Sequence, residues 1–143
     1  MTDLFYEHIF VGRVLEALAE ERSLSKAQRD EGRWLAELRG DPTAADLNAV
    51  AWASVDPNIE SAGADVEHAL RLARAAATLS PTDAGVRDTL AWALFANGEH
   101  EAAVAASERA LELAGSDDAR EYQGTLETLR AKVKEAQAAT EER

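Results

Sequence analysis

Three histidines are the residues of this chain best suited to metal binding or proton transfer, and their spacing argues against both. His8, His68 and His100 fall on three different predicted helices. None has a second histidine four residues away, the spacing that places two imidazoles on one helical face to bind zinc. We therefore expect no metal site and interpret His100 as a packing residue.

Paired carboxylates are the other candidates for acid-base chemistry. Glu20-Glu21 and Asp117-Asp118 are acidic doublets near predicted helix ends. A general acid needs a carboxyl group whose pKa is raised by burial, whereas carboxylates at helix ends are commonly solvated or interact with the helix dipole. The sequence also lacks a glycine-rich phosphate loop. We expect no catalytic residue, no cofactor and no enzymatic activity, with an enzyme of unrecognised site type as one alternative.

The net charge of the chain limits the classes of partner that it is expected to bind. Its 143 residues carry a net charge of -12, which repels phosphate backbones and anionic lipid. Neither a basic patch nor an apolar run of membrane-spanning length is present. Without cysteine the chain needs no oxidising compartment. We expect a cytoplasmic protein that binds neither nucleic acid nor membranes.

Helices must position any functional residue, because strong helix formers dominate the sequence. Apolar residues three to five apart predict a first helix from Leu4 to about Glu21. Ser25 and Gln28 have the form of a capping box, which predicts the start of a second helix. Gly40-Asp41-Pro42 should end that helix near Arg39. Residues 4–39 are therefore predicted to form a helical hairpin.

The rest of the chain divides at its turn formers into further helices within one predicted domain, residues 1–143. The expected segments are a short helix that contains Leu47, Val50, Ala51 and Val55, a loop at Asp56–Gly63, a helix from Val66 that ends at Ser80-Pro81, and helices at Asp83–Asn97, Glu99–Ala114 and 117–139. Residues 140–143 are expected to fray as a tail.

Part of the sequence of these helices is repeated. Ala69, Ala76 and Pro81 recur at one constant offset as Ala103, Ala110 and Gly115. An offset of about 34 residues is typical of stacked helical hairpins, which act as binding scaffolds. The triplet Ala51-Trp52-Ala53 recurs as Ala91-Trp92-Ala93 at a longer offset. About six extra residues therefore lie in the loop of the first copy, so residues 44–81 and 83–115 form two repeats that differ in loop length.

The second copy resembles the tetratricopeptide repeat. The residues that carry the resemblance are Leu90-Ala91, Leu94, Gly98, His100, Ala103-Val104, Ala110-Leu111 and Leu113. The sequence departs from the family pattern at His100, Ser107 and Gly115. The resemblance covers roughly Leu4 to Ala114, with residues 4–39 as a degenerate copy. It implies an all-α fold in which about seven helices stack as antiparallel hairpins in a short right-handed solenoid, closed by a C-terminal capping helix.

The resemblance also implies a binding groove, which the first helix of each hairpin lines. The family's groove positions select six peptide-binding residues: Asn48, Trp52 and Val55 in one repeat, and Asp88, Trp92 and Phe95 in the next. We expect an acidic groove to favour neutral or basic peptides. The alternative interpretation is that both tryptophans pack between adjacent hairpins. If they line the groove, Trp52→Ala and Trp92→Ala should weaken partner binding and leave the helices intact.

Two functions follow from these patterns. The first is a non-catalytic adaptor that binds a peptide or helical segment of a partner protein in the groove. The second is a self-assembly module that associates through its N-terminal edge or its long last helix, which would make the chain a weak homodimer instead of a monomer. That helix carries Tyr122, Leu126, Leu129, Val133 and Ala136 at helical spacing, which suits either a cap or a dimerising helix.

Overall fold

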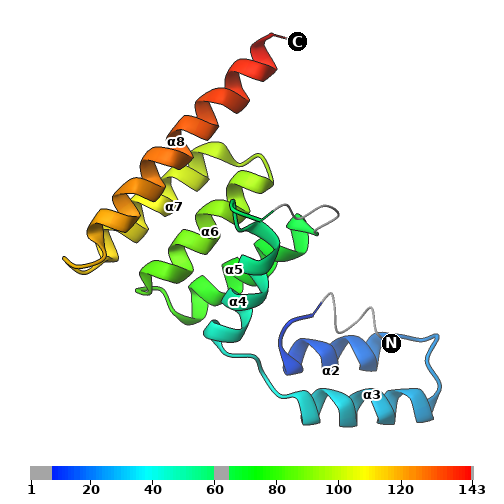
Figure 1. Cartoon of the computed structure of the whole chain (residues 1–143). Coiled ribbons are helices and arrows are strands. Elements are labelled where there is room, and N and C mark those ends of the chain that lie inside the picture. Colours follow the sequence, from blue (N-terminus) through cyan, green and yellow to red (C-terminus); the bar gives the residue numbers. More distant parts are fainter. Residues whose placement is uncertain (1–7, 60–64, 143) are drawn as a thin grey trace. The chain divides into compact units, whose positions relative to one another are not determined.

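The computed structural model describes residues 8–59 and 65–142, and these residues form helices without any strand (Figure 1). This confirms the all-α prediction. The helices are α2 (Val11–Glu20), α3 (Lys26–Arg39), α4 (Ala44–Val55), α5 (Val66–Leu79), α6 (Ala84–Ala96), α7 (His100–Leu113) and α8 (Ala119–Glu141). They divide into two compact units, Met1–Pro42 and Thr43–Arg143, where the sequence predicted one domain. The division falls directly after the helix end at Gly40.

The first unit is the hairpin of α2 and α3. Ser25 and Gln28 form the predicted capping box, in which each side chain accepts a hydrogen bond from the other residue's backbone N–H. Gly40 ends α3 with a φ of 66°, a left-handed conformation that glycine adopts without strain. Among the described residues of this unit, the buried hydrophobic core is small and consists of Val14, Leu18 and Ala36.

Helix α2 begins at Val11, so the predicted start at Leu4 is wrong for residues 8–10, and residues 4–7 lie outside the described part of the chain. Contacts with residues distant in the sequence explain the difference. The Val11 backbone N–H donates to Asp41 Oδ1 at 2.8 Å, and the Arg39 guanidinium donates to the Ile9 carbonyl. These hydrogen bonds hold the segment before α2 out of the helix, and local periodicity cannot reveal them.

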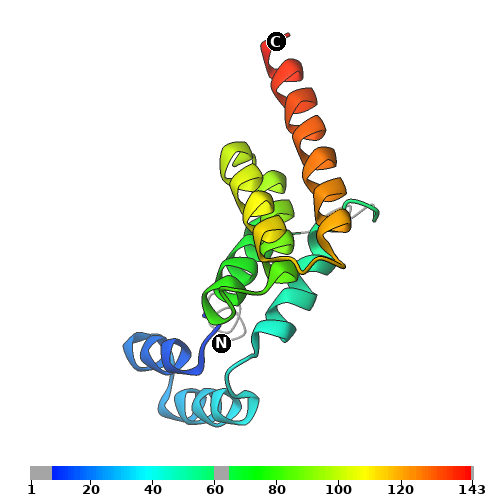
Figure 2. The same ribbon diagram turned by 90° about the vertical axis from the view of Figure 1, so that its left-hand side faces the viewer.

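The second unit consists of α4 to α8, and successive helices pack against each other (Figures 1 and 2). Helix α4 also packs against α6, and α6 against α8. The alanines that recur at a constant offset lie at these contacts: Ala69, Ala76, Ala103 and Ala110 are all buried. Their small side chains allow the helices to approach closely. The repeat in the sequence therefore marks the contacts between helices.

The two hairpins of this unit differ in their connections. Residues 97–99 join α6 to α7, whereas residues 56–65 join α4 to α5. Gly98 makes the shorter turn with a φ of 77°, and the Asn97 side chain donates to the Val66 carbonyl at 2.8 Å. The lengthened loop begins with a turn in which Asp56 Oδ1 accepts hydrogen bonds from the backbone and side chain of Asn58. Residues 60–64 of the predicted loop lie outside the described residues.

Helix α8 buries one face, made of Leu126, Leu129 and Val133. The predicted end at residue 139 is too early, because α8 continues to Glu141 and the tail predicted to fray is helical as far as that residue. Its last turns extend beyond α6 and α7 in both ribbon views (Figures 1 and 2). Within the second unit, consecutive helices alternate in direction, so α4, α6 and α8 run the same way and form one layer.

Candidate functional site

The six predicted binding residues lie on two neighbouring helices, α4 and α6, at equivalent positions. Asn48, Trp52 and Val55 follow one face of α4, and the other three residues follow the same face of α6. Trp92 is only 4% exposed, whereas Trp52 is half-buried. This burial favours the packing interpretation for Trp92.

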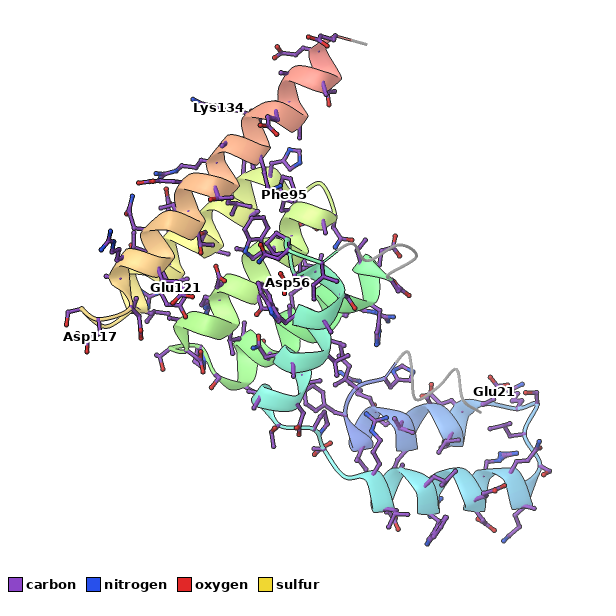
Figure 3. All side chains as sticks on the ribbon, in the orientation of Figure 1. Glu21, Asp56, Phe95, Asp117, Glu121 and Lys134 are labelled. Carbon is purple, nitrogen blue, oxygen red and sulfur yellow. The ribbon has the colours of Figure 1, made fainter. Side chains whose placement is uncertain are left out.

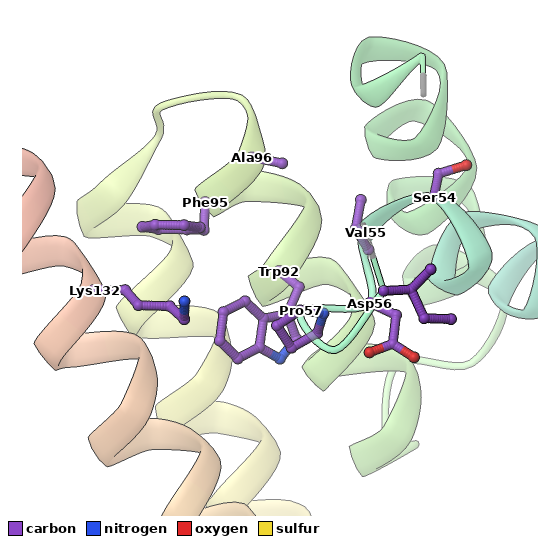
Figure 4. Close-up of a pocket in the computed structure, with 9 residues that line it drawn as sticks. Ser54, Val55, Asp56, Pro57, Trp92, Phe95, Ala96 and Lys132 are labelled. Atoms are coloured by element: carbon purple, nitrogen blue, oxygen red, sulfur yellow. The ribbon is translucent and has the colours of Figure 1, made fainter. Parts of the chain in front are cut away.

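A pocket of about 220 Å³ lies at the C-terminal ends of these two helices. Figure 4 shows how three segments surround it. Its lining comes from the end of α4 and the following loop (Ser54, Val55, Asp56, Pro57, Ile59), from the end of α6 (Trp92, Phe95, Ala96) and from Lys132 of α8. The pocket brings together three of the predicted residues, Val55, Trp92 and Phe95. Asn48, Trp52 and Asp88 do not line it.

Aromatic contacts fix one wall of the pocket. The rings of Trp92 and Phe95 meet edge to face, with centroids 6.1 Å apart and planes at 85°, a favourable arrangement for aromatic pairs. Phe95 also lies against His100, with ring centroids 5.5 Å apart. His100 therefore packs against the aromatic wall from α7, as the sequence predicted.

Six lining residues were not among the predicted binding residues, and one of them, Lys132, comes from a helix outside the expected groove. It lies on α8 between the buried residues Leu129 and Val133, and Figure 4 shows its side chain extending from α8 toward the indole ring of Trp92. The expected groove included only the first helices of the two repeats, whereas α8 adds a third helix to the same layer. In the sequence, a lysine beside the apolar stripe of α8 could indicate a residue that lines a pocket. A solvent-exposed lysine gives the same pattern, so the sequence does not distinguish the two.

Nearer the N-terminus of α6, burial changes the properties of Asp88. The side chain is half-buried, and its Oδ1 has no hydrogen-bond partner among the described residues. Burial, together with the nearby negative charge of Glu121 on α8, raises the pKa of Asp88 from its usual 3.8 to about 6. Burial and the charge of Asp88 in turn raise the pKa of Tyr122. Glu121 is labelled in Figure 3. Asp88 therefore lies where α8 meets α6, outside the pocket.

Asn48 repeats this pattern on α4. Its Oδ1 is also buried without a hydrogen-bond partner in the described part of the chain. Asn48 and Asp88 therefore place polar side chains at equivalent positions of α4 and α6. The pocket at the other end of the same helices has a mainly apolar lining.

Comparison of the chain with protein-family models, curated proteins and solved structures gives no match. None of the helices in residues 8–59 and 65–142 has the length and apolar character needed to cross a membrane. The same residues contain no group of three histidine, cysteine or acidic side chains placed to hold a metal ion. The geometry of the pocket and its surroundings is therefore the basis for a functional proposal.

Proposed function

We propose that this chain is a non-catalytic interaction module that binds a peptide or helical segment of a partner protein along α4 and α6. The observation that supports this function best is the apolar pocket at the ends of these helices, with Val55, Trp92 and Phe95 in its walls. Buried aromatic pockets typically anchor protein interfaces.

The size of the pocket favours a side chain over a free small molecule. Its volume is about 220 Å³, and small-molecule sites usually measure about 300–1,000 Å³. An apolar cavity of about 150 Å³ is sufficient for benzene, so this pocket has room for one large apolar side chain. The net charge of -12 favours a partner segment that is neutral or basic overall.

Filling the pocket should abolish peptide binding. Ala96 lies at the exposed end of α6 and lines the pocket, so Ala96→Trp would occupy the space that the peptide needs. Peptides are first selected from a random phage-displayed library on the immobilised chain, and their affinity is then measured by fluorescence anisotropy. We expect Ala96→Trp to weaken binding at least ~10-fold, which corresponds to about 1.4 kcal/mol.

The matched control is Ala105→Trp, which places the same side chain on an exposed position of α7 outside the pocket lining. It should bind the selected peptides as the unmodified chain does. Equal affinity of the unmodified chain and Ala96→Trp would show that the pocket is not the binding site. Failure of the library to yield any binding peptide would argue against the function itself.

Self-association is a second candidate function, and the surface of α3 favours it. Trp34 and Leu38 are 60% and 69% exposed, and Leu35 lies between them in the sequence with 37% of its surface exposed. Adjacent exposed apolar side chains of this size are typical of an interaction surface. A second copy of the chain would bury them in a symmetric contact between two α3 helices.

Leu38→Lys should eliminate such a dimer. Sedimentation velocity over a concentration series would show the unmodified chain shifting toward a dimer, while the variant stays monomeric. Glu37→Lys is the control, since it introduces the same side chain at the neighbouring exposed position of α3. A strictly monomeric unmodified chain at the highest concentration would exclude this function.

A further inference from the structure

Lys132 is a cation in the wall of an apolar pocket, and it forms no hydrogen bond or ion pair with any described residue. Some other cationic groups of the same unit are paired. Arg130, two residues earlier on α8, donates to Glu108 at 2.5 Å, and Arg74 pairs with Glu99 at 3.1 Å. The one acidic residue in the described lining, Asp56, accepts two hydrogen bonds from Asn58 through Oδ1. The ammonium group is therefore available to a ligand.

The position of Lys132 limits which ligands can fill the pocket. Its side chain is half-buried against the aromatic wall, so a ligand that enters the pocket removes water from the ammonium group. An entirely apolar ligand would leave this charge desolvated and unpaired, which is unfavourable. A ligand that also carries an anion would replace the lost water with a charge-assisted hydrogen bond. The pocket therefore favours an apolar group with an anion beside it.

The number of cationic donors in the pocket lining indicates which kind of anionic group the pocket can bind. Phosphate groups are usually bound by several cationic or backbone donors, and the described lining contains a single cationic side chain. A chain-terminal carboxylate could pair with Lys132 only if the bound segment were the end of its chain. An aspartate or glutamate side chain can supply the carboxylate anywhere within a segment of a partner protein.

The charge of the whole chain sets a further condition. A strongly acidic peptide would be repelled by the net charge of -12, although ionic screening limits this repulsion to about 8 Å at physiological salt. A single carboxylate beside the anchor avoids this repulsion when the remainder of the peptide is neutral or basic. The carboxylate of such a peptide pairs with Lys132, and the net negative charge of the chain does not repel the neutral or basic remainder.

We propose that the pocket binds a large apolar side chain of a peptide, and that an aspartate or glutamate next to this anchor pairs with Lys132. This inference rests on the proposed function and specifies its ligand. It differs from the expectation drawn from net charge alone, because it requires one acidic residue at a defined place in an otherwise neutral or basic segment.

The test compares peptide pairs selected on the immobilised chain, identical except that glutamate or glutamine follows the apolar anchor, with acetylated and amidated ends. We expect the unmodified chain to bind the glutamate peptide about 10-fold more tightly, as for a partly desolvated charge pair. Lys132→Met retains a long unbranched apolar side chain and should bind both peptides equally. Lys134→Met changes an exposed lysine outside the lining and should retain the 10-fold preference.

Failure of this inference can be distinguished from failure of the function on which it rests. If Ala96→Trp blocks both peptides but Lys132→Met leaves the glutamate preference unchanged, the ligand assignment is wrong and the interaction function stands. If the glutamine peptide regains full affinity when its terminus is a free carboxylate, the anion comes from a chain end and the proposal is overturned. If no peptide binds the chain, the proposed function and this inference both fail.

Discussion

Replacing Trp92 with alanine is expected to lower the free energy of unfolding of the unit Thr43–Arg143 by about 3–5 kcal/mol, the usual loss for a large aromatic residue truncated in a core. Trp92 is 4% exposed, and its ring packs edge to face on Phe95. The substitution removes this burial and leaves a cavity that the neighbouring helices fill only in part. Urea denaturation followed by far-UV circular dichroism would measure the loss.

Trp52→Ala is the matched control, because Trp52 occupies the equivalent position on α4 and is more exposed than Trp92. Its truncation should destabilise the same unit clearly less. Similar losses for the two variants would contradict the assignment of Trp92 to the core. This distinction changes how binding must be tested, since loss of binding by Trp92→Ala would not separate a damaged fold from a damaged site. Ala96→Trp does not have this difficulty.

Helix positions and ends were largely predictable because their signals are local. Local backbone geometry is specified by the capping box at Ser25 and by the glycines at positions 40 and 98. The alanines that recur in α5 and α7 mark positions of close helix packing through their small size alone. The start of α2 was not predictable, because Asp41, far along the chain, determines it. Propensity and periodicity do not contain information about such a contact.

The candidate site was predictable only in part, for the same reason. Of the six groove positions that the family resemblance implied, only Val55, Trp92 and Phe95 line the pocket. Whether Trp92 is open or buried depends on how α6 packs against its neighbours α4, α5, α7 and α8. The contribution of Lys132 depends on the rotation of α8 about its own axis, which a pattern of alternating charged and apolar residues specifies poorly. Tertiary packing, more than local sequence, therefore decides which of the predicted positions line the pocket.

Asp88→Asn is expected to stabilise the same unit by about 2 kcal/mol near neutral pH and to have little effect at about pH 4. Burial, with a smaller contribution from Glu121, raises the pKa of Asp88 from 3.8 to about 6 in the folded chain. At ~1.36 kcal/mol per pH unit this shift corresponds to about 3 kcal/mol. The lower figure allows for the remaining solvation of a half-buried side chain.

The sign of the pH dependence follows from proton binding. Between about pH 3.8 and pH 6 the folded chain holds the Asp88 proton more tightly than the unfolded chain does. The contribution of Asp88 to stability therefore decreases as pH rises through this window, and asparagine removes that decrease. Two other groups of the unit Thr43–Arg143 act in the opposite direction. A hydrogen bond from Thr43 lowers the pKa of Asp46, and burial lowers the pKa of His68, so both reduce stability as pH falls.

Those opposing contributions are common to the unmodified chain and the variant, so they cancel in the difference between the two unfolding free energies. Urea titrations of both proteins at a series of pH values would give this difference directly. Asp117→Asn is the control, since it removes one negative charge from an exposed position in the turn before α8 (Figure 3). A constant difference between Asp88→Asn and the unmodified chain from acidic to neutral pH would mean that Asp88 titrates as a solvated carboxylate. In that case α8 would not exclude water from this part of α6, and the layer of α4, α6 and α8 would be open at the end opposite the pocket.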